Sequence, residues 1–88
     1  MVNYSILEEN IIKYMNHKYK IHMTLDHLEL RLIDLGLDSL DMVELIITLE
    51  EKYGIIITPS EFDETDTFRK LVDISYNKIK NIKKSKKS

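Results

Sequence analysis

Residues 35–54 have the sequence LGLDSLDMVELIITLEEKYG and contain the clearest helix of this 88-residue chain. From residue 39 to residue 53, apolar side chains recur at the spacing of one helix face, and acidic side chains largely occupy the other face. Asp38 or Ser39 is the expected N-cap, and Gly54 follows the last periodic residue, as a C-cap does. The apolar positions are Leu40, Val43, Ile46, Ile47, Leu49 and Tyr53.

Two more long helices are predicted by the same periodicity. The first covers residues 4–19, with Asn3 or Ser5 as its N-cap, and the last runs from a cap at Asp66 or Thr67 through about Lys80. A short helix is expected to begin at the Thr-Pro-Ser-Glu sequence of residues 58–61, with Phe62 anchoring it to the core.

Two stretches fit neither helix nor strand. Residues 20–38 contain many leucines without a sustained period, which predicts a long loop that tucks them under the helices, with at most one short helical turn. Residues 55–57 are three isoleucines with no second strand to pair with, and we expect an extended, buried connector. The fold class is therefore all-α, a small four-helix bundle of three main helices and one short helix, with a long loop between the first two.

Charge is distributed unevenly along the chain. Residues 34–66 contain ten acidic residues and one lysine, a net charge of −9, whereas residues 78–88 contain six lysines and no acid. The acidic middle repels nucleic acid and suits a basic protein surface. We expect one domain over residues 1–80, followed by a basic, disordered tail at 81–88.

Composition excludes several classes of protein. Without cysteine, the chain forms no disulfide and no Cys-based metal site or nucleophile, and the three histidines are spaced by five residues, which does not favour a shared metal. No apolar run is long enough to span a bilayer, and the N-terminus does not resemble a signal peptide. We therefore expect a monomeric, cytoplasmic protein with no membrane span, no metal and no nucleic-acid partner.

Ser39 is the candidate functional residue. Its hydroxyl could simply cap the helix. No histidine lies nearby in sequence to activate it, the flanking Asp38 and Asp41 disfavour an oxyanion, and the segment lacks the G-x-S-x-G elbow of hydrolases. A catalytic role is therefore not expected, and an exposed serine surrounded by acids suits a substrate that another enzyme modifies.

The segment Leu35-Gly36-Leu37-Asp38-Ser39-Leu40 resembles the Leu-Gly-x-Asp-Ser-Leu attachment motif of acyl carrier proteins and peptidyl carrier domains. The similarity continues through residues 41–45, 49–54 and 57–59, and covers about residues 4–80. The resemblance implies a four-helix carrier domain that is not an enzyme. It also implies that a phosphopantetheinyl transferase uses coenzyme A and magnesium to attach 4′-phosphopantetheine covalently to Ser39.

The resemblance also implies two surfaces. An acidic helix would dock on acyl-transferring, condensing or ligase enzymes with basic docking surfaces, using Asp38, Leu40, Asp41, Met42, Glu44, Glu50 and Glu51. A cleft between the helices would hold the acyl cargo, lined by Val43, Ile46, Ile47, Ile57, Phe62 and Leu71. The alternatives for these residues are a plain solvated face and an ordinary core.

Three functions remain open at this point. The first is an acyl carrier that shuttles thioesters in fatty-acid or specialised-metabolite synthesis, such as polyketide or nonribosomal peptide synthesis. The second is a D-alanyl or other aminoacyl carrier, which Pro59-Ser60-Glu61-Phe62-Asp63 resembles. The third is a helical protein-interaction module without a prosthetic group, in which Ser39 is only a cap.

Overall fold

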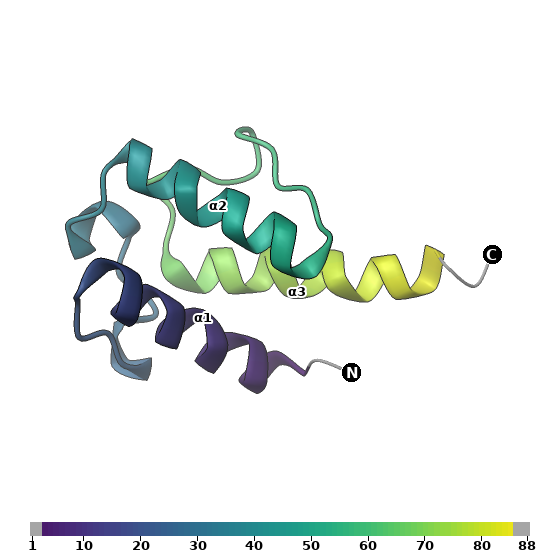
Figure 1. Ribbon diagram of the computed structural model, residues 1–88, viewed down its shortest axis with the longest axis horizontal. Helices are drawn as coiled ribbons and strands as arrows, with labels where there is room; N and C mark the ends of the chain where they lie inside the picture. Colours follow the sequence, from purple (N-terminus) through teal and green to yellow (C-terminus); the bar gives the residue numbers. More distant parts are fainter. Residues whose placement is uncertain (1–2, 86–88) are drawn as a thin grey trace.

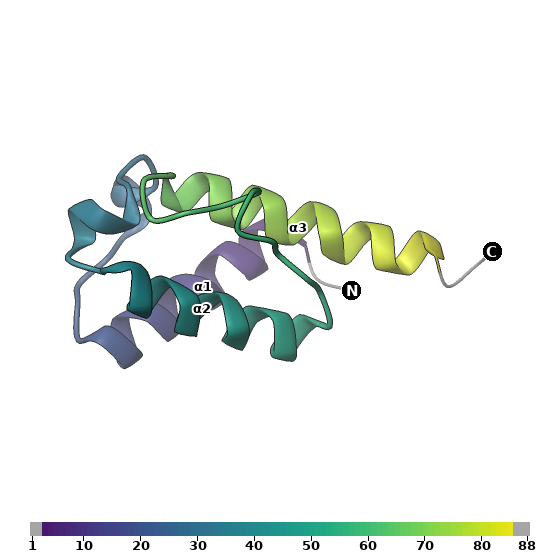
Figure 2. The same cartoon turned by 90° about the horizontal axis from the view of Figure 1, so that it is seen from above.

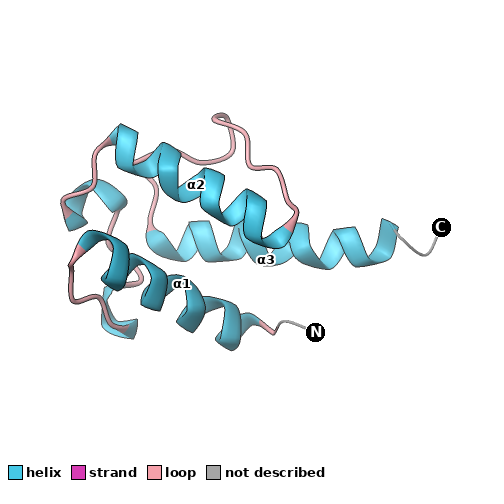
Figure 3. Ribbon diagram, viewed as in Figure 1, coloured by secondary structure: helices cyan, strands magenta, loops and turns pink. Residues whose placement is uncertain are grey.

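A computed structural model describes residues 3–85 of the chain, with side chains described through residue 82. Helices dominate this part of the chain, and no strand forms within it beyond a single antiparallel bridge between Arg31 and Thr67 (Figure 3). The elements, in chain order, are α1 (Tyr4–Tyr19), the 3-10 turns η1 (Leu25–His27) and η2 (Leu32–Leu35), α2 (Ser39–Tyr53) and α3 (Phe68–Ser85).

The three α-helices lie side by side, and the two 3-10 turns cluster at one end of the bundle (Figure 1). α1 ends at the same end of the bundle at which α2 and α3 begin, so α1 runs opposite to the other two helices (Figures 1 and 2). The segment between α2 and α3 therefore travels back along the bundle. This arrangement is the all-α bundle that the sequence predicts, except that residues 20–38 contain two 3-10 turns where at most one short helical turn was expected.

Local side-chain chemistry sets the ends of the helices. The Asn3 side chain accepts the Ile6 N–H at 2.8 Å and is the N-cap of α1. Gly54 ends α2 with a positive φ of 67°, which glycine adopts without a steric penalty, and its N–H donates to the Glu50 carbonyl. The predicted bounds of these two helices are confirmed.

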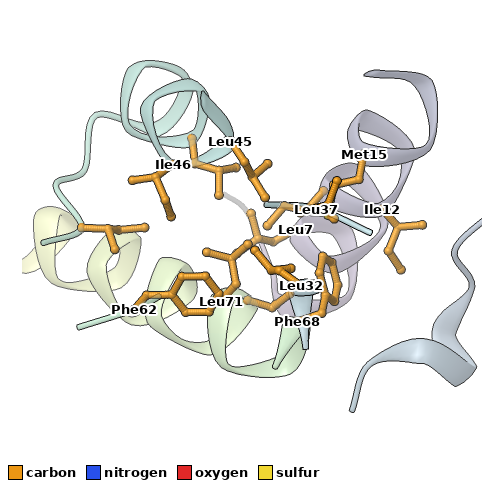
Figure 4. Packing of buried hydrophobic residues seen from close by; sticks show 14 of the residues in the cluster. Leu7, Ile12, Met15, Leu32, Leu37, Leu45, Ile46, Phe62, Phe68 and Leu71 are labelled. Carbon is orange, nitrogen blue, oxygen red and sulfur yellow. The ribbon is translucent and has the colours of Figure 1, made fainter. Parts of the chain in front are cut away.

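One apolar core joins the helices, η2 and the α2–α3 segment (Figure 4). An aromatic contact at the surface adds to it, since the rings of Tyr4 and Tyr76 meet edge to face at 5.4 Å between centroids. The labelled core side chains are Leu7, Ile12, Met15, Leu32, Leu37, Leu45, Ile46, Phe62, Phe68 and Leu71. Because isolated helices of this length are marginal in water, this shared burial is what holds them.

The segment after α2 differs from the sequence prediction in two respects. Ile55 and Ile57 are buried as expected, but Ile56 is exposed, because successive side chains of an extended segment point in opposite directions, and residues 58–61 form a turn and not a short helix. The Glu61 N–H donates to the Thr58 carbonyl at 2.9 Å and the Glu61 carboxylate accepts the Thr58 N–H at 2.8 Å, which together close the turn. Phe62 is nonetheless buried, as predicted.

The last helix is longer than predicted. α3 continues past Lys80 to Ser85, and Thr67 caps its start by accepting the Lys70 N–H at 3.2 Å. The disorder expected for the tail falls in part on residues 86–88, which lie outside the described residues. Within the described part of the chain, no helix combines the length and apolar character that crossing a bilayer needs.

Candidate functional site

Ser39 is the first residue of α2, and it is exposed to solvent. The capping role belongs to its neighbour, because the Asp38 carboxylate accepts the Asp41 N–H at 2.8 Å. The Asp41 carboxylate in turn accepts the Asp38 N–H at 3.2 Å, which completes a reciprocal capping box. The Ser39 hydroxyl is therefore not needed to hold the helix, and the interpretation of Ser39 as the N-cap is wrong.

Contacts from α1 fix the position of α2. The Tyr19 hydroxyl donates to the Asp41 backbone carbonyl at 3.1 Å, and the Tyr14 hydroxyl lies 3.2 Å from Thr48 Oγ1. Burial, and then the nearby Tyr14, Glu44 and Asp41, raise the pKa of Tyr19 to about 12, so its hydroxyl stays a proton donor at neutral pH. Two tyrosines of α1 thus hold the helix that presents Ser39.

A surface hollow of ≈ 400 Å³ opens beside Ser39. One side of it comes from the end of η2, and another from Glu64 in the segment before α3. The backbone ties these sides together, since the Ile33 N–H donates to the Glu64 carbonyl at 3.2 Å. This pairing could not be predicted from sequence, because Ile33 and Glu64 lie far apart in the chain. The lining residues are Ile33, Gly36, Leu37, Asp38, Ser39 and Glu64.

The predicted docking residues divide into two groups. Glu44, Glu51 and Leu40 are exposed, and Leu40 shows 69% of its surface to solvent, which is unusual for a leucine. The others also serve the fold: Asp38 and Asp41 form the capping box, Glu50 accepts the Ile57 N–H at 2.8 Å, and Met42 is half-buried against the core.

A second cavity, of ≈ 210 Å³, lies between α2 and the following segment. It brings together five of the six residues predicted to hold the cargo, namely Val43, Ile46, Ile47, Ile57 and Phe62. The structure does not place Leu71 on its wall, because that side chain is fully enclosed in the core. Met42, Glu50, Thr58 and Pro59 also line the cavity, and they were not predicted to do so.

An ion pair ties the outer wall of this cavity to α3. The Glu61 carboxylate lies 2.9 Å from Lys78 Nζ and also accepts the Thr58 N–H and hydroxyl, at 2.8 and 3.0 Å. The backbone hydrogen bond from Thr58, followed by the Lys78 and Thr58 side chains, lowers the pKa of Glu61 to about 2. Glu61 therefore remains ionised over the physiological range.

An all-helical bundle that presents an exposed serine at the start of an acidic helix is the architecture of a carrier domain. Residues 20–74 match the family model described as phosphopantetheine attachment site, so the chain belongs to that family. The matched residues contain Ser39 and both hollows described above.

Among individual relatives, acyl carrier proteins are similar to this chain. One from Buchnera aphidicola is 49% identical over 51 residues, and one from Campylobacter hominis is 48% identical over 48 residues. These matches cover 58% and 54% of this chain, and the chain spans only 61% of the length of each relative.

Solved structures show the same fold. An acyl carrier protein from Thermotoga maritima superposes with a TM-score of 0.76 at 22% identity, covering 90% of this chain and 93% of that one. The 3,7-dioxo-octyl actinorhodin acyl carrier protein of Streptomyces coelicolor superposes at 0.68 with 26% identity, covering 91% and 93%. The all-α bundle is thereby confirmed.

The prosthetic group of this family is 4′-phosphopantetheine, attached covalently, and the residues at Ser39 fit it. Ser39 is exposed, its hydroxyl does not cap the helix, and a hollow adjoins it. A phosphate on Ser39 would lie at the N-terminus of α2, where the helix dipole favours negative charge and the Asp38 and Asp41 carboxylates oppose it. The exposed hydroxyl and the adjoining hollow are the two features that suit a phosphoester at this position.

Proposed function

We propose that this chain is an acyl carrier protein, with 4′-phosphopantetheine on Ser39 and acyl groups carried as thioesters between the enzymes of fatty-acid or specialised-metabolite synthesis. The observation that carries the proposal is the exposed Ser39 hydroxyl, which Asp38 frees from capping inside a segment that matches the attachment-site family. When bound, the group supplies the thiol that this cysteine-free chain lacks.

The chain displays Ser39 to the modifying enzyme and does not itself catalyse the attachment of phosphopantetheine. No residue capable of activating Ser39 as a nucleophile is bonded to it within residues 3–85, and the two aspartates beside it are engaged with backbone N–H groups. A phosphopantetheinyl transferase must therefore supply the base and the magnesium ion. The exposed Glu44, Glu51 and Leu40 offer that enzyme, and later acyl-transferring ones, an acidic surface with an apolar side chain at its N-terminal end.

We assign the cavity between α2 and the following segment to the acyl group. Its lining is mostly aliphatic, with Phe62 as the one aromatic side chain. Glu50 and Glu61 hold the outer wall in place through Ile57 and Lys78. An apolar chain shielded there would be protected from water until a partner enzyme accepts it.

Intact-mass spectrometry after incubation with coenzyme A, magnesium and a phosphopantetheinyl transferase tests the proposal. We expect a gain of one phosphopantetheine, absent in Ser39→Ala and retained in Ser60→Ala, a matched exposed serine. No gain with several transferases would contradict the proposal. Loading of the modified chain by purified acyl and aminoacyl ligases then separates an acyl carrier from an aminoacyl carrier.

A further inference from the structure

We propose that the hollow beside Ser39 is a binding site for the pantoate part of the prosthetic arm, with Ile33 packing against its geminal methyl groups. This inference rests on the proposed function, because it takes Ser39 as the attachment point. This hollow and the cavity assigned to the acyl group share no lining residue.

Ile33 is the feature that first calls for an explanation. It lies on η2 with 50% of its surface exposed, although the neighbouring Leu32 is fully buried. The Ile33 N–H donates to the Glu64 carbonyl at 3.2 Å, which ties this part of the backbone to the segment before α3. The Ile33 side chain lines the hollow together with Ser39, and an apolar side chain in a hollow is suited to an apolar group of a ligand.

The successive groups of the prosthetic arm, taken outward from Ser39, suit the residues that line the hollow. The phosphate comes first, at the N-terminus of α2, where the helix dipole favours negative charge and the Asp38 and Asp41 carboxylates oppose it. One methylene group separates it from the carbon that carries the two methyl groups, so these methyls remain near the attachment point. The hydroxyl and amide N–H beyond them are donors, and Glu64, which also lines the hollow, has a carboxylate that can accept.

The open side of the hollow leaves room for the arm. Gly36 turns the chain at the end of η2 with a φ of 86°, and a Cβ added there would meet no atom within 4 Å. Asp34, on η2, is paired with Arg31 by a two-point contact at 2.9 and 3.0 Å, so its charge is balanced. The hollow therefore presents Ile33, Asp38 and Glu64 to the group that Ser39 carries.

Nuclear Overhauser measurements on the labelled chain carrying an unlabelled arm test this site, after mass spectrometry has verified loading. We expect contacts between the geminal methyl protons and Ile33, together with a shift of the Gly36 amide signal on loading. Ile33→Ser should lose both effects. Ile56→Ser, a matched exposed isoleucine that lines neither hollow, should keep them.

The outcomes separate this site from the proposed function. A loaded chain whose methyl protons contact only Val43 and Ile47, or no residue, would overturn the site and leave the carrier function standing. A chain that gains no mass in the presence of transferase would overturn both. Equal contacts in Ile33→Ser and the unsubstituted chain would show that Ile33 is not the binding residue.

Discussion

At the scale of single residues, two side chains have roles that only the folded structure reveals. The Glu61–Lys78 ion pair joins residues seventeen positions apart, on segments that no sequence period relates. Ser75 lies on α3, where its hydroxyl is fully buried and finds no hydrogen-bond partner in the described structure. Each leads to a prediction.

We expect Glu61→Gln to remove part of the stability of the chain at neutral pH. The pKa of Glu61 is about 2 in the folded protein and 4.5 ordinarily, so its ionised form stabilises the fold above pH 4.5. That contribution declines as the pH falls from 4.5 towards 2. Urea unfolding at a series of pH values should show the two proteins converging at the acid end.

Glu51→Gln is the control for this comparison, because Glu51 is exposed on α2 and forms no ion pair with the side chains described, those of residues 3–82. It should leave the pH profile of the unsubstituted chain unchanged. If the difference in unfolding free energy between Glu61→Gln and the unsubstituted chain stayed constant down to pH 2, the charge of Glu61 would not be the cause of that difference.

Ser75→Ala is expected to stabilise the chain. A buried hydroxyl without a partner has lost its hydrogen bonds to water and gained none, and alanine is also the better helix former. We expect a gain of about 1 kcal/mol in the free energy of unfolding, measured in urea. Asn77→Ala, at an exposed position in the interior of α3, measures the helix-propensity part, because asparagine and serine have similar helix propensities. A loss of stability in Ser75→Ala would mean that the hydroxyl does find a partner.

At the scale of elements, periodicity and caps were sufficient to locate the long helices. The bounds of α1 and α2 follow from apolar spacing together with Asn3, Asp38 and Gly54, whose chemistry is local. Residues 58–67 were harder to interpret, since side chains there bond nearby backbone N–H groups in patterns that imitate a helix start. Asp63, for example, accepts the Thr65 N–H at 2.8 Å.

The hollow beside Ser39 was not predictable from sequence for a different reason. Its walls come from η2 and from Glu64, which meet only because the Ile33 and Leu32 N–H groups donate to carbonyls in the segment before α3. By contrast, five of the six cavity residues could be predicted, because they follow the apolar face of α2 and the connector that packs on it.

Two substitutions at Asp38 separate the contribution of the capping hydrogen bond from the contribution of the Asp38 charge to the stability of α2. Asp38→Ala removes the acceptor of the Asp41 N–H and should cost about 1 kcal/mol of unfolding free energy. Asp38→Asn keeps an acceptor and should cost only a few tenths of a kcal/mol. Urea unfolding of both variants measures the difference. Equal losses would show that charge, and not the hydrogen bond, stabilises the start of α2.

The exposed face of α2 is expected to control the rate at which partners engage the chain. Glu44→Lys should slow modification of Ser39 by a phosphopantetheinyl transferase by roughly threefold to tenfold at low salt, and less at high salt. Circular dichroism should show unchanged helix content. Glu9→Lys, the same charge reversal at an exposed position of α1, is the control. Equal rates for Glu44→Lys and the unsubstituted chain would contradict the docking role.

At the scale of the whole molecule, a single core supports both the fold and the cavity. Phe62 belongs to both, since it is buried among core side chains and also lines the cavity between α2 and the connector. The total stability of a domain of this kind is only about 5–15 kcal/mol. A substitution at Phe62 therefore tests how much of that stability depends on one anchor in a segment without helical structure.

Phe62→Ala is expected to lower the free energy of unfolding by about 3–5 kcal/mol, because it removes a buried ring and enlarges a cavity that already exists. Ile56→Ala, on the same segment but 71% exposed, should change it by no more than about 0.5 kcal/mol. Urea unfolding monitored by circular dichroism measures both. If Phe62→Ala lowered the free energy of unfolding as little as Ile56→Ala, the connector would not be anchored in the core, and the cavity wall could not shield an acyl chain. If Phe62→Ala lowered it by the expected amount of about 3–5 kcal/mol, the Phe62 ring would both stabilise the bundle and close the space assigned to the acyl group.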